Sequence, residues 1–131
     1  MATVTVTCPV YPSEDPEKVR AAVLNIFPTA QLELSDGALK GTADLDRFSK
    51  RIREQRILDT ARSQLQKGEK RGHTVTVIHL NKQVATVGKV SFVDYRTVLG
   101  TIDVTVEDPE LDALIDRVAP VTVNGEEVKP E

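Results

Sequence analysis

The chain has 131 residues, of which 40% are apolar and 28% charged, and these values are typical of one globular domain. A single cysteine excludes an intramolecular disulfide and a cysteine-rich metal site. No apolar run approaches the roughly 18 residues that span a membrane, so we expect a cytoplasmic protein. We expect a single domain over residues 1–131, with a core over about residues 2–120 and a C-terminal extension over residues 121–131.

The first elements are predicted by alternation and by capping signals. Over residues 3–10, Val4, Val6, Cys8 and Val10 fall on one face and three threonines on the other, which predicts a half-buried strand. A helix is expected between Asp15, its N-cap, and Pro28, which ends it. An Asp-Gly pair then predicts a hairpin between strands at residues 31–34 and 38–41.

A long polar segment over residues 44–68 carries two apolar faces that do not align. Leu45, Phe48 and Ile52 share one helical face, whereas the apolar residues that follow Arg56 lie on a rotated face. We therefore expect two helices that meet within RIREQR. This stretch has no proline or glycine, so we attribute the break to tertiary packing.

The remaining elements are mostly strands. Residues 73–80 predict a central strand, and residues 89–93 and 100–106 predict further strands. Capping and an apolar stripe indicate a helix over residues 108–120, and the Asn-Gly pair at residues 124–125 is compatible with a small terminal hairpin. This order predicts an α+β fold, with a mostly antiparallel sheet and helices packed on one face.

The formal net charge of −3 hides a strong asymmetry along the chain. Residues 40–96 carry thirteen bases and six acids, a net charge of +7, whereas residues 97–131 carry two bases and nine acids, a net charge of −7. A solvated helix face and an anion-binding face are both consistent with the basic middle segment.

The usual catalytic and cofactor-binding patterns are missing from the sequence. The Gly-Lys pair is not a phosphate-binding loop, because Gln83 and Val90 stand where such a loop needs glycine and a hydroxyl. His73 and His79 lie roughly 20 Å apart on one expected strand, too far to share a metal. Cys8 lies on an apolar face with no histidine nearby in sequence. The sequence therefore predicts no cofactor, no metal site and no catalytic residue.

The segment IREQRILDTAR is more suggestive. Asp59 lies three residues from both Arg56 and Arg62, so it can orient a guanidinium group toward a phosphate. The alternative is a solubilising ion pair on the surface. Aromatic platforms for stacking single-stranded bases are scarce, and Tyr95 is the only candidate near this segment. These features favour a mode of binding that reads backbone and shape.

Five segments together carry a family resemblance: VTVTCPVYPSEDPEKVRAAVLNIFP, RIREQRILDTAR, HLNKQVATVGKVSF, LGTIDV and DPELDALIDRVAP. Through them, and as far as about Pro120, the chain resembles a family of small uncharacterised archaeal proteins described as predicted RNA-binding. The resemblance implies a fold similar to the large-subunit ribosomal protein that binds 5S ribosomal RNA, and RNA binding by analogy of fold. The family's motif residues all stand in place here: Arg53, Gln55, Asp59, Arg62, Asn81, Lys82 and Gln83.

We therefore expect a non-enzymatic RNA-binding protein of unknown target. Its expected contacts are phosphate contacts from Arg51, Arg53, Arg56, Arg62, Lys82 and Lys89, and base or ribose contacts from Asn81 or Gln83, with Asp59 as the orienting residue. One alternative is a homodimer or protein-interaction module, in which the basic middle segment meets the acidic C-terminal third of a partner copy. A less favoured alternative is an enzyme that acts on a small phosphorylated ligand.

Overall fold

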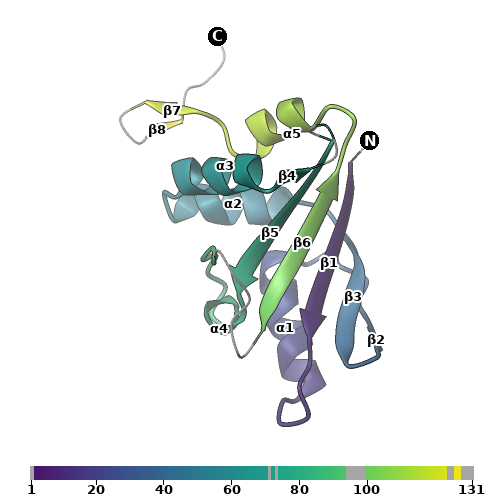
Figure 1. Cartoon of the computed structure of the whole chain (residues 1–131). Coiled ribbons are helices and arrows are strands. Elements are labelled where there is room, and N and C mark those ends of the chain that lie inside the picture. The colour runs from purple at the N-terminus through teal and green to yellow at the C-terminus, as the bar shows by residue number, and fades with distance from the viewer. Residues whose placement is uncertain (1, 71, 73, 94–99, 124–125, 128–131) are drawn as a thin grey trace.

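The computed structural model describes residues 2–70, 72, 74–93, 100–123 and 126–127 of the chain. Six strands form one sheet in the order β2-β3-β1-β6-β5-β4, and every neighbouring pair is antiparallel (Figure 1). The strands are β1 (Thr3–Pro9), β2 (Glu33–Ser35), β3 (Ala38–Ala43), β4 (Glu69–Lys70), β5 (Val75–Asn81) and β6 (Thr101–Glu107). The predicted α+β fold with an antiparallel sheet is therefore confirmed.

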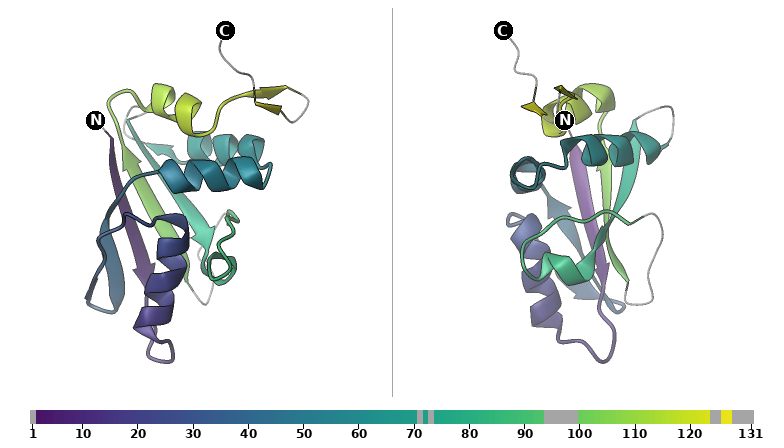
Figure 2. Two further views of the ribbon diagram at one scale, coloured as in Figure 1. Left: turned by 180° about the vertical axis from the view of Figure 1, so that it is seen from behind. Right: turned by 90° about the vertical axis from the view of Figure 1, so that its left-hand side faces the viewer.

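The helices are α1 (Pro16–Ile26), α2 (Asp46–Glu54), α3 (Leu58–Lys67), α4 (Lys82–Ala85) and α5 (Leu111–Val118). Helices α1, α2 and α4 lie on the same side of the sheet (Figure 2). Among the described residues, no helix combines the length and the hydropathy that crossing a bilayer requires.

The two faces of the sheet differ in the way that the alternation of β1 predicts. Val6 pairs with Val104 of β6, and both are fully buried beneath the helices. Thr5 pairs with Thr105, and these side chains lie half-buried on the opposite face. The helices therefore cover the apolar face, and the other face of the sheet is rich in threonine.

Local signals place the first helix and the first hairpin. The side chain of Asp15 accepts a hydrogen bond of 2.9 Å from the amide of Glu17, which satisfies one of the free N–H groups at the start of α1. The β2–β3 turn has positive φ at both Asp36 (52°) and Gly37 (76°), as the favoured two-residue hairpin turn requires.

The expected break between the two middle helices is a Schellman motif without its usual glycine. The amide of Ile57 donates to the carbonyl of Ile52 (3.0 Å), and the amide of Arg56 donates to the carbonyl of Arg53 (3.1 Å). Arg56 takes the left-handed conformation that closes such a motif, with φ of 58°. Arginine pays a steric cost there that glycine avoids.

After residue 73 the structure departs from the sequence expectation at two points. Residues 89–93 do not form a strand: Phe92 makes only an isolated bridge with Leu80, because the side chain of Gln55 occupies both backbone hydrogen-bonding groups of Val90. The short helix α4 was not predicted. The predicted strand at residues 73–80 is β5, which pairs with β6 throughout and with β4 at only two positions. His73 lies outside the described residues.

The small terminal hairpin with which the Asn-Gly pair is compatible is present, since strands pair on both sides of residues 124–125. Strand β7 (Thr122–Val123) pairs with β8 (Glu126–Glu127) in a separate two-stranded sheet. The turn itself, residues 124–125, lies outside the described residues.

Candidate functional site

The segment between β5 and β6 is fixed to the rest of the fold at several points. We call residues 81–92 the anchored loop. At its start, the Asn81 side chain accepts hydrogen bonds from the amides of Gln83 (2.8 Å) and Val84 (3.2 Å) and so caps α4. After α4, Gly88 takes a positive φ of 76°, and the amide of Lys89 returns to the carbonyl of Val84 at 3.1 Å. Asn81 therefore shapes the backbone of this loop.

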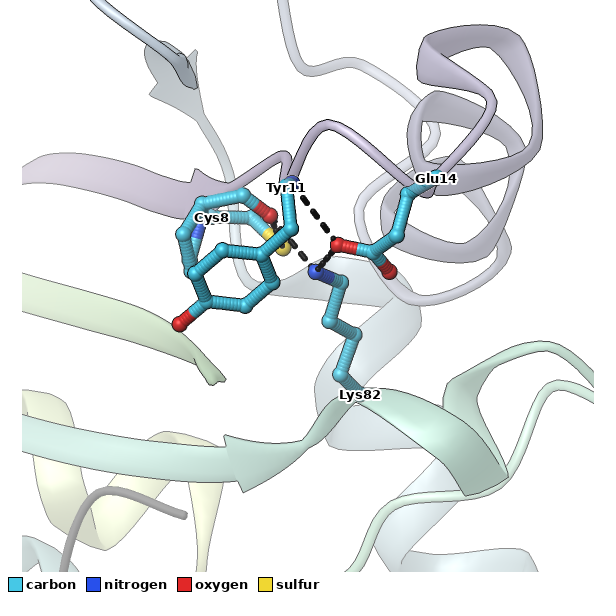
Figure 3. A network of polar contacts seen from close by, with 5 residues as sticks. Cys8, Tyr11, Glu14 and Lys82 are labelled. Atoms are coloured by element: carbon cyan, nitrogen blue, oxygen red, sulfur yellow. Dashed lines mark hydrogen bonds and ion pairs between the residues drawn. The ribbon is translucent and has the colours of Figure 1, made fainter. Parts of the chain in front are cut away.

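Lys82 fixes the loop to the segment that joins β1 to α1. Its side chain is only 4% exposed, and Nζ donates to the carbonyl of Pro9 (2.6 Å) and to Oε1 of Glu14 (2.7 Å). Nζ also lies 5.1 Å from the centroid of the Tyr11 ring, within the range of a cation–π contact. Figure 3 shows the Lys82 ammonium between the Tyr11 ring and the Glu14 carboxylate. The charge of Lys82 is thus matched inside the protein.

The same contacts set the ionisation of Glu14. Burial raises the pKa of Glu14, but hydrogen bonds from Lys82 and from the amide of Tyr11, together with the positive charge of Lys82, outweigh it and leave the pKa below its ordinary value. Glu14 is therefore held as a carboxylate, and the pair forms an ionic link between α4 and the start of α1.

Two amide side chains fix the rest of the anchored loop. Asn25 of α1 donates to the carbonyls of Ala85 (2.9 Å) and Thr86 (3.2 Å), at the end of α4. Gln55, just after α2, donates to the carbonyl of Val90 (2.8 Å) and accepts from its amide (2.7 Å). Because the Gln55 side chain satisfies both the carbonyl and the amide of Val90, it takes the place that a neighbouring strand would have at this residue.

The outer part of the anchored loop faces solvent. Four of its residues are exposed, namely Gln83, Thr86, Val87 and Lys89, and Val87 is 72% exposed. The loop is thus held on its inner side by three separate segments, while its outer side chains remain available to a partner.

Two of the arginines expected to bind phosphate lie against the end of α5. Arg53 donates to the carbonyls of Arg117 (3.1 Å) and Val118 (3.5 Å) and also contacts the Ser49 hydroxyl. Arg62 donates to the carbonyl of Ala119 at 3.2 Å.

Arg62 also forms an ion pair with Asp116, at 2.7 Å. These guanidinium groups donate to carbonyls at the C-terminal end of α5, where helix carbonyls lack partners within the helix, and this is a structural task.

The expected role of Asp59 does not match its contact. Its carboxylate accepts a hydrogen bond from the hydroxyl of Thr122 at the start of β7, and Arg62 turns to Asp116 instead. In the described part of the chain, Asp59 therefore helps to attach the C-terminal hairpin to α3, and no contact shows it orienting a guanidinium.

Three other expected residues form a basic corner, which we define as Arg51, Arg56 and Lys89. A Cβ atom built on Gly88 would lie 3.4 Å from a terminal nitrogen of Arg51, so this guanidinium lies against the anchored loop beside Lys89. Arg56 and Lys89 are exposed and are the chain neighbours of the hydrogen-bonded residues Gln55 and Val90. The corner thus combines the end of α2 with the outer part of the loop.

Arg51 has an unusual buried atom. Its Nε is buried, and among the described residues it is the only buried side-chain nitrogen or oxygen without a hydrogen-bond partner. A buried N–H group of a charged side chain costs free energy when it is unsatisfied.

The described residues provide little for other kinds of chemistry. They contain no group of three or more histidine, cysteine or acidic residues able to hold a metal ion. Burial raises the pKa of the Cys8 thiol to about 11, which keeps it protonated and unreactive. His79 and Asp103 form a cross-strand pair on the threonine-rich face, with Nδ1 and Oδ1 2.6 Å apart.

Four residues that fix this site were not expected to do so from the sequence: Tyr11, Glu14, Asn25 and Gln55, of which only Gln55 stood out, as a family motif residue. Asn25 and Gln55 contact backbone groups at least 35 residues away in the chain, and Glu14 meets Lys82 across 68 residues. A capping asparagine before Lys82 was the one local signal of α4 that sequence reading missed.

Comparison with known proteins defines the class of this chain. Residues 3–107 match a family described as RNA binding. The chain is 45% identical over 124 residues to a UPF0200/UPF0201 protein of Archaeoglobus fulgidus, covering 92% of this chain but only 38% of that protein's length. It is 37% identical over 134 residues to the UPF0201 protein of Metallosphaera sedula, covering 95% and 92% of the two chains.

Solved structures agree with the sequence relatives. The crystal structure of the UPF0201 protein from Methanococcus jannaschii has a TM-score of 0.83 at 33% identity, covering 97% of this chain and 99% of that one. The chain therefore belongs to the UPF0201 family of archaeal proteins. The family resemblance expected from the sequence is confirmed.

Proposed function

We propose that this protein binds RNA through the basic corner, with the exposed side of the anchored loop as the rest of the contact surface. The observation that carries the proposal is the position of Arg51, whose guanidinium lies against the anchored loop at Gly88, directly before Lys89. A guanidinium fits the oxygens of a phosphate, and Lys89 adds a second positive charge nearby. The family's description as RNA binding supports the same conclusion.

The eight contact residues expected from the sequence have two different roles in this proposal. Arg51, Arg56 and Lys89 contact phosphates, and Gln83 is free to contact a base or a ribose. The others hold the surface in shape: Arg53, Arg62, Asn81 and Lys82. Asp59 supports the C-terminal hairpin.

A salt titration of RNA binding tests the proposal. Filter binding of cellular RNA at two salt concentrations is expected to show weaker binding at higher salt, because each neutralised phosphate contributes a slope of roughly −0.7 to −0.9 in log affinity against log salt. Lys89→Ala is expected to lower the affinity and to reduce the magnitude of that slope by about one contact.

Lys40→Ala is the matched control, since Lys40 is an exposed lysine on β3, outside the basic corner. Equal losses from Lys40→Ala and Lys89→Ala would argue against a localised site. Absence of micromolar binding at low salt would overturn the proposal. A dimer that light scattering detects at low salt and not at high salt would then favour the interaction-module alternative.

A further inference from the structure

A pocket of about 310 Å³ lies between the loop that precedes α1, helix α1 itself and α4. Its floor is apolar, because Val19 and Ala22 line it and are only 5% and 2% exposed. Its volume is near the lower end for ligand pockets, which suits one small ring system. An apolar floor beneath a polar rim favours a flat ligand whose hydrogen-bonding groups lie at its edge.

Three polar groups of the pocket retain unused hydrogen-bonding capacity. The contacts of Glu14 all use Oε1, so Oε2 accepts no hydrogen bond from a described residue (Figure 3). The side-chain amide of Gln83 and the hydroxyl of Ser13 likewise make none within the described part of the chain. Carboxylates and amides are the groups with which proteins read the edges of nucleobases.

The charges around the pocket favour a neutral ligand. Lys18 and Lys82 line it together with Glu14 and Asp15, so two positive charges are balanced by two negative ones. A phosphate gains little from such a set, whereas the basic corner carries three positive charges. The two sites therefore suit different parts of one nucleotide, the uncharged ring and the anionic phosphate.

The anchored loop brings these two sites close together. Gln83 directly precedes Val84, whose carbonyl accepts a hydrogen bond of 3.1 Å from the amide of Lys89. The side chain of Gln83, which lines the pocket, and that of Lys89, which belongs to the basic corner, therefore project from adjoining turns of one short segment. Because the loop is fixed by Lys82, Asn25 and Gln55, their relative position is set before any ligand binds.

We propose that the pocket between α1 and α4 accepts a single nucleobase, with Val19 and Ala22 beneath the ring and with Gln83 and Oε2 of Glu14 at its edge. The base belongs to an unpaired nucleotide of the RNA whose phosphates lie on the basic corner, and in this respect the inference rests on the proposed function. A free nucleotide carries the same ring and is the other possible source.

The test compares a hairpin RNA that has an unpaired loop with a fully paired duplex of the same stem, and with the four nucleoside monophosphates. The hairpin is expected to bind more tightly than the duplex. Gln83→Ala is expected to lower hairpin affinity about tenfold, the effect of one lost hydrogen-bonding side chain, and to lower duplex affinity clearly less. Gln66→Ala, at an exposed glutamine of α3, is the matched control.

Amide shifts in NMR titrations separate the outcomes. If no RNA binds but a monophosphate shifts Ala22, Gln83 and Thr86 in the native protein and not in Gln83→Ala, the base pocket stands and the proposed RNA function fails. If hairpin and duplex bind equally, and Gln83→Ala changes neither, the base pocket is overturned while the RNA function stands. If neither RNA nor nucleotide binds, both are overturned.

Discussion

Lys82 shows at the level of single residues how a side chain's surroundings decide its role. The sequence placed it in a loop motif beside other polar residues, so a phosphate contact was the natural expectation. In the fold it is buried, and its ammonium meets a carbonyl, a carboxylate and a ring. Its partner is 68 residues away in the chain, so no local pattern was able to predict this pair.

We expect Lys82→Met to lower the free energy of unfolding by about 2 kcal/mol, because it keeps the apolar stem but leaves Glu14 and the Pro9 carbonyl without their donor. The value is below that for a fully buried pair, since the Glu14 side chain remains 23% exposed and water can reach it. Urea unfolding measures the change. Lys18→Met, at an exposed lysine of α1, is the control and is expected to change stability by about 0.5 kcal/mol or less.

The lowered pKa of Glu14 predicts how this stability depends on pH. The folded-state pKa lies below the ordinary value of 4.5, so the folded state binds fewer protons than the unfolded state between these two pKa values. The contribution of Glu14 is therefore complete above about pH 4.5 and is lost as the pH falls through the folded-state pKa. Unfolding curves from pH 7 down to pH 3 are expected to show a smaller acid-induced loss in Glu14→Gln than in the native protein.

At the level of elements, the α2–α3 break is a case in which sequence reading found the location but not the geometry. Two misaligned apolar stripes required the chain to turn near Arg53–Arg56. The stop itself is a backbone motif with arginine in the position that usually holds glycine. Tertiary contacts support it, since Gln55 binds the anchored loop immediately before the turn.

Arg56→Gly separates the structural role of this position from its proposed role in RNA binding. Relief of left-handed strain is partly offset by the greater freedom of glycine in the unfolded chain, so we expect stability to stay equal or to rise by up to about 1 kcal/mol. RNA affinity is expected to fall. Lys50→Gly, in the middle of α2, is the control and is expected to cost about 1 kcal/mol in thermal or urea unfolding.

Strand and helix assignments succeeded where the pattern was local and failed where a long-range contact intervened. The alternation of β1 and the caps of α1 belong to neighbouring residues, so the sequence contains them. Residues 89–93 have a strand-like composition, but the Gln55 side chain takes the hydrogen bonds that a strand partner needs. Such long-range contacts bring together the residues of the candidate site. Only part of the site was therefore predictable from the sequence.

At the level of the whole molecule, Cys8 lies at 0% exposure in β1, between two neighbouring strands. With a pKa of about 11, only about one thiol in a thousand is ionised at pH 8. We expect iodoacetamide to label it only when the molecule unfolds globally, so that labelling and urea unfolding give the same free energy. Val87→Cys, which adds a highly exposed thiol, is expected to label one equivalent at once; similarly rapid labelling of native Cys8 would contradict the prediction.

The strand order also has a consequence for biosynthesis. Strand β1 is made before the rest of the sheet, yet it lies in the interior of the sheet and pairs along one side with β6, from Thr3 opposite Glu107 to Thr7 opposite Asp103. On the ribosome, the backbone groups along this edge of β1 must therefore wait for almost the whole domain before they are paired. Pairing between such distant segments is slow because a long loop has to close first. The threonines that alternate with the valines of β1 keep the waiting strand half polar, which limits its tendency to associate with other nascent chains.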